Sequence, residues 1–249
     1  MTTYYLFQAE KDLFIQVANE VGLELKTGCN DDNLWRNRHP LAFLVEAADD
    51  ICYRIMDFED GFRLGFVSFK EVEELLMPLT TRVKLKSYSG RDKNDKIGYL
   101  RAKAISGLVH DLSNVFIDEE KKLLNDKLDI DLISLIPASN ILEEIRKISI
   151  DKIYSYRSVV ERETAGYEVL AGLLDIFINA VNEATQENIS PKYKNILKLL
   201  PQQFISLSGK PEPSLYIRLL KITDFVSGMT DSYAVSLYRK IKGISLPEL

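Results

Sequence analysis

Residues 40–64, PLAFLVEAADDICYRIMDFEDGFRL, decide the fold class, because their apolar side chains recur at helical spacing without a break. Pro40 stands at the start of this stretch, where the first turn of a helix tolerates proline. Outward from it, the same spacing recurs along almost the whole chain, and period-two alternation bounded by turn residues is hard to find. The sequence therefore predicts an all-α protein.

Further helices are predicted on both sides of this one. They span residues 7–21, 97–117, 140–158, 165–184 and 192–204, and a last pair meets near Gly228. Ser68 and Glu71 have the spacing of a capping box before a short helix that Pro78 closes. Residues 84–95 lack periodicity and are expected to form an exposed loop. Because there is no internal repeat, low-complexity tract or linker, residues 1–249 are interpreted as a single all-helical domain.

The composition is typical of a globular protein with a buried core, since 46% of the 249 residues are hydrophobic and 28% are charged. The formal net charge is -5 and the basic residues are not massed in one block, so composition gives no electrostatic footprint for nucleic acid or an anionic membrane. Cys29 and Cys52 form neither a disulfide framework nor a CxxC pair. Without a secretory leader or a run of about 18 uncharged apolar residues, we expect a cytoplasmic protein with no membrane partner.

The polar side of the helix at residues 40–64 is unusually acidic. On a wheel of about 100° per residue with Asp49 at zero, Tyr53 lies at about 40° and Asp57 at about 80°. The same side also holds Asp60, Glu46 and Asp50. The arc from about 180° to 340° is predicted to face the core. It holds Phe58, Ile51, Leu44, Ile55, Ala48, Leu41, Cys52, Val45 and Met56.

An acidic face can simply be solvated, which is the more common case for an arbitrary amphipathic helix. Here like charges three and four positions apart repel by a few tenths of a kcal/mol per pair, and no Lys or Arg at i+4 relieves Asp49, Asp57 or Asp60. We therefore expect a compensating group, such as a metal ion or an arginine from another helix. Asp49, Tyr53 and Asp57 offer a carboxylate for a divalent ion, then a phenol and a second carboxylate, which suits an extended phosphorylated ligand.

Residues 39–61, HPLAFLVEAADDICYRIMDFEDG, resemble the final motif of the deoxyguanosine triphosphate triphosphohydrolases, a branch of the HD-domain metal-dependent phosphohydrolases. The resemblance continues, in order, through FQAEKDLF at residues 7–14, ERETAGYEVLAGLLD at 161–175 and ITDFVSGMTDSYAVSLYRKIKGI at 222–244. It covers essentially the whole chain. It implies a multi-helical HD-domain-like bundle, of which this chain is the carboxy-terminal portion.

The resemblance also implies a reaction and a set of site residues. The reaction is hydrolysis of a deoxynucleoside triphosphate, with dGTP as the leading substrate, to the deoxynucleoside and tripolyphosphate by a water that Mg²⁺ or Mn²⁺ activates. Asp49 matches the distant aspartate of the family's metal site, and Tyr53 and Asp57 match positions that contact the phosphates and sugar. Arg101, in YLRAKAI, lies about where the family places basic residues that contact substrate. The family's habit also implies a homo-oligomer.

The chain departs from the family in its histidines. The family's first histidine and its His-Asp pair precede the matched region and are absent here, so no catalytic residue is assigned. Of the two histidines, His39 is interpreted as a helix-entry residue, and His110-Asp111, in LVHDLSNVF, as a decoy late in a helix. With Asp49 as the one plausible ligand, a tight metal site is hard to complete in this chain alone. The isolated chain is therefore predicted to be inactive. The divalent cation of the complete family site need not be present in this chain.

Two further interpretations remain open. The first is a non-catalytic helical oligomerisation module, for which apolar residues among residues 225–238, FVSGMTDSYAVSLY, are candidates, although core packing is favoured for them. The second is a nucleic-acid-binding domain that uses a basic stretch at residues 82–101. A solvated loop, partly neutralised by Asp92 and Asp95, is slightly favoured over it. The basic residues of the stretch are Arg82, Lys84, Lys86, Arg91, Lys93, Lys96 and Arg101.

Overall fold

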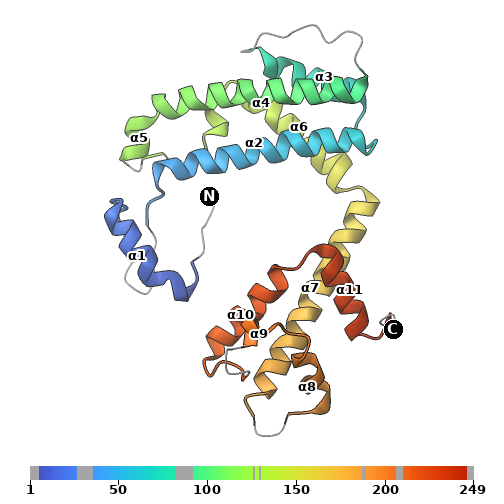
Figure 1. Cartoon of the computed structure of the whole chain (residues 1–249). Coiled ribbons are helices and arrows are strands. Elements are labelled where there is room, and N and C mark those ends of the chain that lie inside the picture. The colour runs from blue at the N-terminus through green and yellow to red at the C-terminus, as the bar shows by residue number, and fades with distance from the viewer. Residues whose placement is uncertain are drawn as a thin grey trace. The chain divides into compact units, whose positions relative to one another are not determined.

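The prediction of an all-α protein is confirmed. The computed structural model describes residues 6–26, 36–81, 92–125, 127–128, 130–186, 189–205 and 210–245. Within these ranges the regular elements are helices (Figure 1), and one isolated bridge joins Leu25 and Arg36. The chain divides into two compact units, Met1–Tyr156 and Arg157–Leu249, each with its own hydrophobic core. The interpretation of the chain as a single domain stays a prediction.

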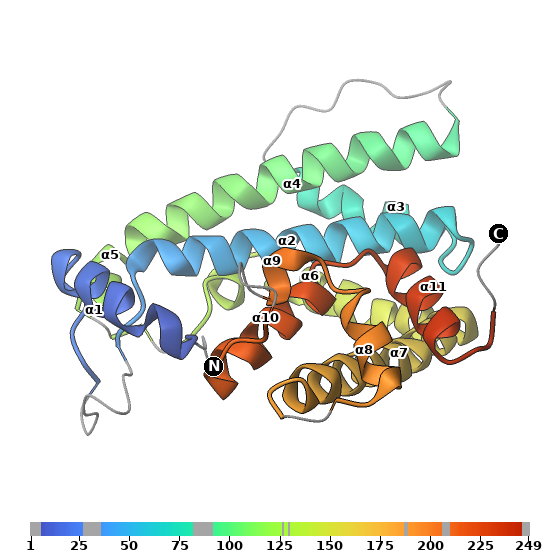
Figure 2. The same cartoon turned by 60° about the horizontal axis from the view of Figure 1, so that its bottom comes forward.

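The first unit contains the helices α1 to α6. They are α1 (Lys11–Glu20), α2 (Pro40–Arg63), α3 (Phe69–Leu76), α4 (Lys93–Asp118), α5 (Glu120–Leu124) and α6 (Ser139–Ile148), with 3-10 turns at Gln8–Glu10, Met77–Thr80 and Ile133–Leu135. α6 continues directly as a π-helical segment, Ser149–Tyr154. In Figures 1 and 2, α4 runs alongside α2. Ile55 and Phe58 of α2 and Leu100 of α4 are fully buried in the core that these helices share.

The starts of the helices in this unit follow from their sequences. At α2, Nδ1 of His39 accepts a hydrogen bond from the backbone N–H of Leu41 at 3.2 Å, so His39 is a helix-entry residue as predicted. At α3, Ser68 and Glu71 form the predicted capping box, in which each side chain accepts a hydrogen bond from the other's backbone N–H. Gly22, the predicted terminator of the first helix, has a φ of 73° and is the second residue after the end of α1.

The second unit is built around one long helix. It contains α7 (Arg157–Glu183), α8 (Pro191–Leu197), α9 (Gln202–Ile205), α10 (Leu215–Ser227) and α11 (Asp231–Ile241). The predicted pair of helices that meets near Gly228 is confirmed as α10 and α11. Leu173, Phe177 and Ile222 are fully buried in its core, where the rings of Phe177 and Phe225 meet edge to face at 5.2 Å between centroids.

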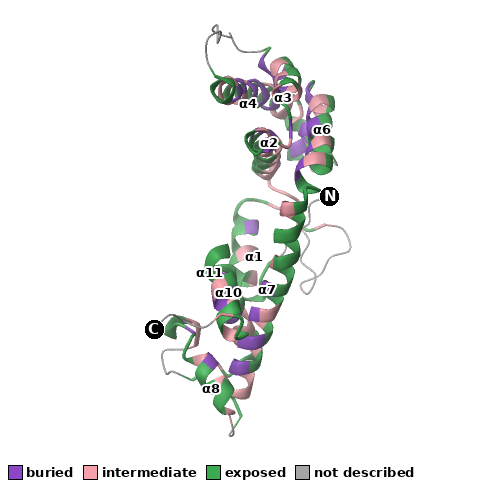
Figure 3. Cartoon of the chain, turned by 90° about the vertical axis from the view of Figure 1, so that its right-hand side faces the viewer, coloured by how far each residue is buried: buried purple, intermediate pink, exposed green. Residues whose placement is uncertain are grey.

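α7 is buried along only part of its length. Its first turns are exposed, and its buried residues begin at Val169 (Figure 3). By length and composition alone this helix could cross a membrane, but a core helix of a soluble protein meets the same criterion. Leu173, Phe177 and Val181 lie in the core of the second unit. The apolar character of α7 is therefore accounted for, at these positions, by core packing.

The predicted start of α4 is wrong. The helix begins at Lys93 and not at Ile97, because Asp92 accepts a hydrogen bond from the backbone N–H of Asp95 at 2.9 Å and so caps the first turn. The first turn of α4 is therefore helical where the sequence predicts an exposed loop. The rest of that loop, residues 84–91, lies outside the described residues.

Two other helix boundaries also differ from the prediction. The predicted helix at residues 140–158 changes to π-helical geometry at Ser149, and α7 begins at Arg157, well before the predicted start at Ala165. The predicted helix at residues 192–204 is two helices, α8 and α9, because Pro201 lies between them and lacks the backbone N–H that a continuous helix needs.

Candidate functional site

The acidic face of α2 is the candidate functional site. Asp49, Tyr53 and Asp57 lie one turn apart within this regular helix, so their side chains project along one edge of it. Asp49 is exposed, Tyr53 is 61% exposed and Asp57 is half-buried. The helix therefore presents the three predicted site residues together at the surface of the first unit.

The acids of this face differ in their partners. Glu46 forms an ion pair with Arg38 at 2.5 Å, and Asp50 forms one with Arg54 at 3.2 Å. No hydrogen bond or ion pair joins Asp49 to any other residue in the described part of the chain. The carboxylate of Asp49 is therefore open to a ligand, whereas Glu46 and Asp50 are already paired with arginines.

Tyr154 is a member of this site that sequence analysis misses. Its hydroxyl donates a hydrogen bond to Oδ2 of Asp57, which lies 97 residues earlier in the chain. Burial, this hydrogen bond and the nearby Asp57 and Tyr53 raise the pKa of the Tyr154 phenol well above its usual range. Among the described residues, the partner of Asp57 is thus a phenol, where the sequence suggests a metal ion or an arginine. No motif or spacing around Tyr154 marks it.

The prediction for the apolar side of α2 is partly wrong. Its buried apolar residues are Phe43, Ala47, Ile51, Ile55 and Phe58. Five residues of the predicted core-facing arc instead form an exposed apolar band beside Asp49, because the helices α3, α4 and α6 of the first unit cover only one side of α2. The band consists of Leu41, Val45, Ala48, Cys52 and Met56, with Leu41 55%, Val45 68% and Met56 47% exposed.

Arg101 lies away from the edge that holds Asp57. Its Nη1 is 2.6 Å from Oε2 of Glu59, and Nη2 of Arg63 is 2.7 Å from Oε1 of the same carboxylate. Glu59 is only 1% exposed. Because Glu59 follows Asp57 by two positions, the two side chains leave α2 about 160° apart. The structure therefore does not bring Arg101 to the other predicted site residues, and its contact with substrate stays a prediction.

Glu59 is a second residue that sequence analysis misses, although a signal for it exists. On the wheel it falls at about 280°, inside the arc that is otherwise apolar. An acid at such a position, with Arg63 four residues later, indicates a buried ion pair.

Neither histidine joins Asp49 in a metal site. His39 caps α2, and His110 is exposed late in α4, next to the partly buried Asp111. In the described ranges, no three His, Cys, Asp or Glu side chains gather in a way that could hold a metal ion. Those residues therefore do not fit a divalent cation by themselves.

The basic stretch is described only in part. Nζ of Lys93 and Nζ of Lys96 lie 5.7 and 6.0 Å from the ring centroid of Phe69, and Arg101 pairs with Glu59. Residues 82–91 lie outside the described residues. Nucleic-acid binding through this stretch stays a prediction.

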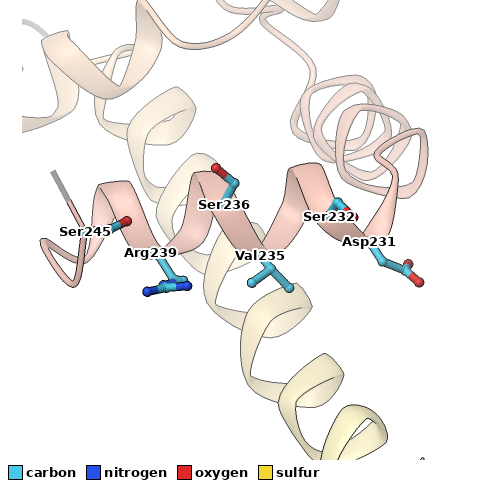
Figure 4. Close-up of a pocket in the computed structure, with 6 residues that line it drawn as sticks. All are labelled: Asp231, Ser232, Val235, Ser236, Arg239 and Ser245. Carbon is cyan, nitrogen blue, oxygen red and sulfur yellow. The ribbon is translucent and has the colours of Figure 1, made fainter. Parts of the chain in front are cut away.

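Residues 225–238 serve the core of the second unit, as the sequence analysis favours. Phe225, Val226, Ala234 and Leu237 are buried there. A shallow pocket of about 430 Å³ lies along the outer side of α11, where Figure 4 shows Val235 and Arg239 on the same side of the helix. It is lined by Asp231, Ser232, Val235, Ser236, Arg239 and Ser245. None of the predicted site residues lines this pocket.

Known proteins resemble this chain over nearly its whole length. Residues 138–240 match the family of the phosphohydrolase-associated domain. A deoxyguanosinetriphosphate triphosphohydrolase-like protein of Synechocystis is 40% identical over 243 residues, which cover 98% of this chain and 53% of that protein. A protein of the same description from Pseudomonas aeruginosa is 34% identical over 249 residues, covering 97% of this chain and 54% of the relative.

The deoxyguanosinetriphosphate triphosphohydrolase of Yersinia enterocolitica is 26% identical over 246 residues, which cover 82% of this chain and 49% of that enzyme. The chain thus spans about half the length of the relatives it matches. Within that half, its sequence is similar to those of the deoxyguanosinetriphosphate triphosphohydrolase-like proteins, and its residues 138–240 match the phosphohydrolase-associated domain.

Proposed function

We propose that this chain supplies one wall of the nucleotide site of a deoxynucleoside triphosphate triphosphohydrolase. Asp49 is a ligand of a divalent cation, Mg²⁺ or Mn²⁺, and Tyr53 and Asp57 contact the phosphates and sugar of the nucleotide. The observation that carries the proposal is the edge of α2, where these three side chains are presented together at the surface. The names of the relatives support the reaction class and dGTP as the leading substrate.

The surroundings of Asp49 support a role at an interface. The residue is exposed and has no partner among the described residues, so its oxygens are available to a cation. The apolar band beside it is exposed as well, and contiguous exposed apolar residues mark a surface that another polypeptide covers. We take that polypeptide to be the part of the family's length that this chain does not span, which by resemblance carries the histidine and His-Asp ligands.

The described residues do not complete a cation site, so no catalytic step is assigned to this chain alone. Asp49 offers one carboxylate, and a catalytic metal needs several protein ligands in a fixed geometry. The chain by itself is therefore expected to be inactive. As a whole, we propose a cytoplasmic homo-oligomer in which the complete site forms only with the remaining half of the family's architecture.

The test compares the chain alone with a chimaera in which the preceding half of the Synechocystis relative is joined to it. Release of tripolyphosphate from dGTP is measured with Mg²⁺ or Mn²⁺. We expect no release from the chain alone and measurable release from the chimaera. Asp49→Asn in the chimaera should abolish release, because it removes a metal ligand, whereas Asp118→Asn at the exposed end of α4 should leave it unchanged.

Release of tripolyphosphate by the chain alone would contradict the incomplete site, and full activity of the Asp49→Asn chimaera would contradict the metal ligand. A folded chimaera without activity would favour the second candidate function, a non-catalytic helical assembly module. The exposed apolar band on α2 is the observation that favours this alternative. In that case Val45→Asp, at the most exposed residue of the band, should abolish the assembly without unfolding the chain.

A further inference from the structure

The contact between Tyr154 and Asp57 depends on a segment of unusual geometry. α6 changes at Ser149 into a π-helical segment that ends at Tyr154. Such turns are rare and occur frequently at functional sites. Ser149 is buried, and its Oγ has no hydrogen-bond partner among the described residues. The segment thus contains a buried polar group without a partner, which native structures rarely keep.

Gly61 allows this segment to approach α2 closely. It follows Asp57 by one turn on the same edge of the helix. A Cβ at Gly61 would lie 2.3 Å from Cδ1 and 2.8 Å from Cγ1 of the buried Ile153, so any side chain there would force Ile153 to move. Because Tyr154 follows Ile153 directly, the same close approach brings its hydroxyl to Asp57.

Contacts on both sides of Tyr154 hold the segment in place. Before it, Nζ of Lys152 lies 2.5 Å from Oε1 of Glu71, at the start of α3. After it, the ring of Tyr156 stacks on Phe66, with 4.0 Å between centroids and 27° between planes. Tyr154 is therefore fixed by its neighbours in the chain, independently of any ligand.

We propose that Tyr154 is a positioning residue of the candidate nucleotide site and acts through Asp57, an inference that rests on the function proposed above. The neutral phenol donates to Oδ2 of Asp57 and so fixes the orientation of the carboxylate. Oδ1 of Asp57 is left to accept a hydrogen bond from a hydroxyl or N–H group of the ligand, since an ionised carboxylate only accepts. Tyr53, one turn earlier on α2, faces the same space.

The test uses the whole chain with ¹³C at Cζ of its tyrosines. Tyr154→Phe removes the hydroxyl and keeps the ring, and Tyr156→Phe is the matched control because it keeps the ring that stacks on Phe66. Each variant lacks one labelled tyrosine, so the ¹³C resonance that disappears from its spectrum is assigned to that residue. Binding of dGTP is measured in the presence of Mg²⁺ on the chimaera described above, in which the proposed site is complete, and circular dichroism confirms that each variant is folded.

We expect Tyr154→Phe to weaken dGTP binding by about tenfold, the effect of losing one hydrogen bond to a charged group. Tyr156→Phe should change it by less than about twofold. In an Asp57→Asn background, Tyr154→Phe should add nothing, because its effect passes through that carboxylate. Unchanged binding by Tyr154→Phe, or additive losses in the double variant, would overturn the role of Tyr154 while leaving the proposed function intact.

The pH dependence of the same resonances tests the pair without nucleotide. Tyr154 should stay protonated up to about pH 11, where a tyrosine with the ordinary pKa of about 10 is mostly ionised, and should ionise earlier in Asp57→Asn. Ordinary ionisation of Tyr154 in the unsubstituted chain would overturn the pair itself. A folded chimaera that shows the pair but binds no dGTP would overturn the proposed function, and the ligand role of Tyr154 with it.

Discussion

Glu59 is buried on α2 between the guanidinium groups of Arg63 and Arg101, which are 54% and 35% exposed. A buried carboxylate loses its hydration and is strongly destabilising unless it is paired and hydrogen-bonded. Two charge-assisted contacts satisfy both of its oxygens. Arg101 therefore stabilises the contact between α2 and α4 through its ion pair with Glu59, whether or not it also binds substrate.

Arg101→Met removes the guanidinium and keeps an apolar side chain of similar reach. The buried Glu59 then keeps only the more exposed Arg63, so the free energy of unfolding should fall by about 2 kcal/mol, less than the loss on breaking a fully buried pair. Denaturant titration followed by circular dichroism measures this. Arg146→Met, which breaks an exposed pair with Glu143, is the control and should leave the free energy of unfolding essentially unchanged. A loss of dGTP affinity at unchanged stability would instead favour contact between Arg101 and substrate.

At the scale of elements, α2 shows what helical periodicity determines. The wheel correctly predicts that Ile51, Ile55 and Phe58 lie in the core. The buried arc is nevertheless rotated by about 60° from its predicted direction, since Phe43 and Ala47 are buried and Val45 is exposed. The sequence pattern is the same whether or not a neighbouring helix covers an apolar residue, so the placement of the neighbours decides which residues are buried. The same holds for the π-helical segment, which no periodicity signals.

Glu71 joins two elements, because it caps α3 with Ser68 and pairs with Lys152 of the π-helical segment. The hydrogen bond from Lys152, followed by those from Ser68, lowers the pKa of Glu71 from 4.5 to about 2. The folded state therefore favours the ionised carboxylate more than the unfolded state does. This stabilisation is complete above about pH 4.5 and is lost as the pH falls toward 2.

Glu71→Gln should lower the free energy of unfolding at neutral pH. The further decrease in this free energy between about pH 4.5 and 2 should be smaller in the variant than in the unsubstituted chain, as measured by urea unfolding over that range. Glu74→Gln is the matched control, because the pair of Glu74 with Lys70 is wide, at 3.7 Å, and exposed. Parallel pH curves for the unsubstituted chain and the Glu71→Gln variant would show that Glu71 does not stabilise the fold in this way.

At the scale of the whole molecule, the chain holds two hydrophobic cores with no buried residue in common. The core of the first unit centres on Phe58, and that of the second on Phe177. The match to the phosphohydrolase-associated domain, residues 138–240, begins directly before α6 of the first unit and extends through most of the second. The family match therefore does not coincide with the division into compact units.

Phe177→Ala should lower the stability of the second unit by about 3 to 5 kcal/mol, the usual loss for removing a buried aromatic ring. Amide hydrogen exchange, followed by mass spectrometry, should then accelerate in α7 and α10 and stay unchanged in α2 and α4. Phe58→Ala should give the reverse pattern. Equal acceleration in both units would support the single domain that the sequence predicts.

The sequence by itself determined the helical class, the position of α2 and its acidic edge, because these depend on residues close together in the chain. Capping at Ser68 and the break between α10 and α11 near Gly228 are local in the same sense. Only the tertiary structure decided that Tyr154 meets Asp57, that Arg101 serves Glu59, and that the apolar band stays exposed. Each of these depends on contacts between segments far apart in sequence, whose approach is set by packing and not by local periodicity.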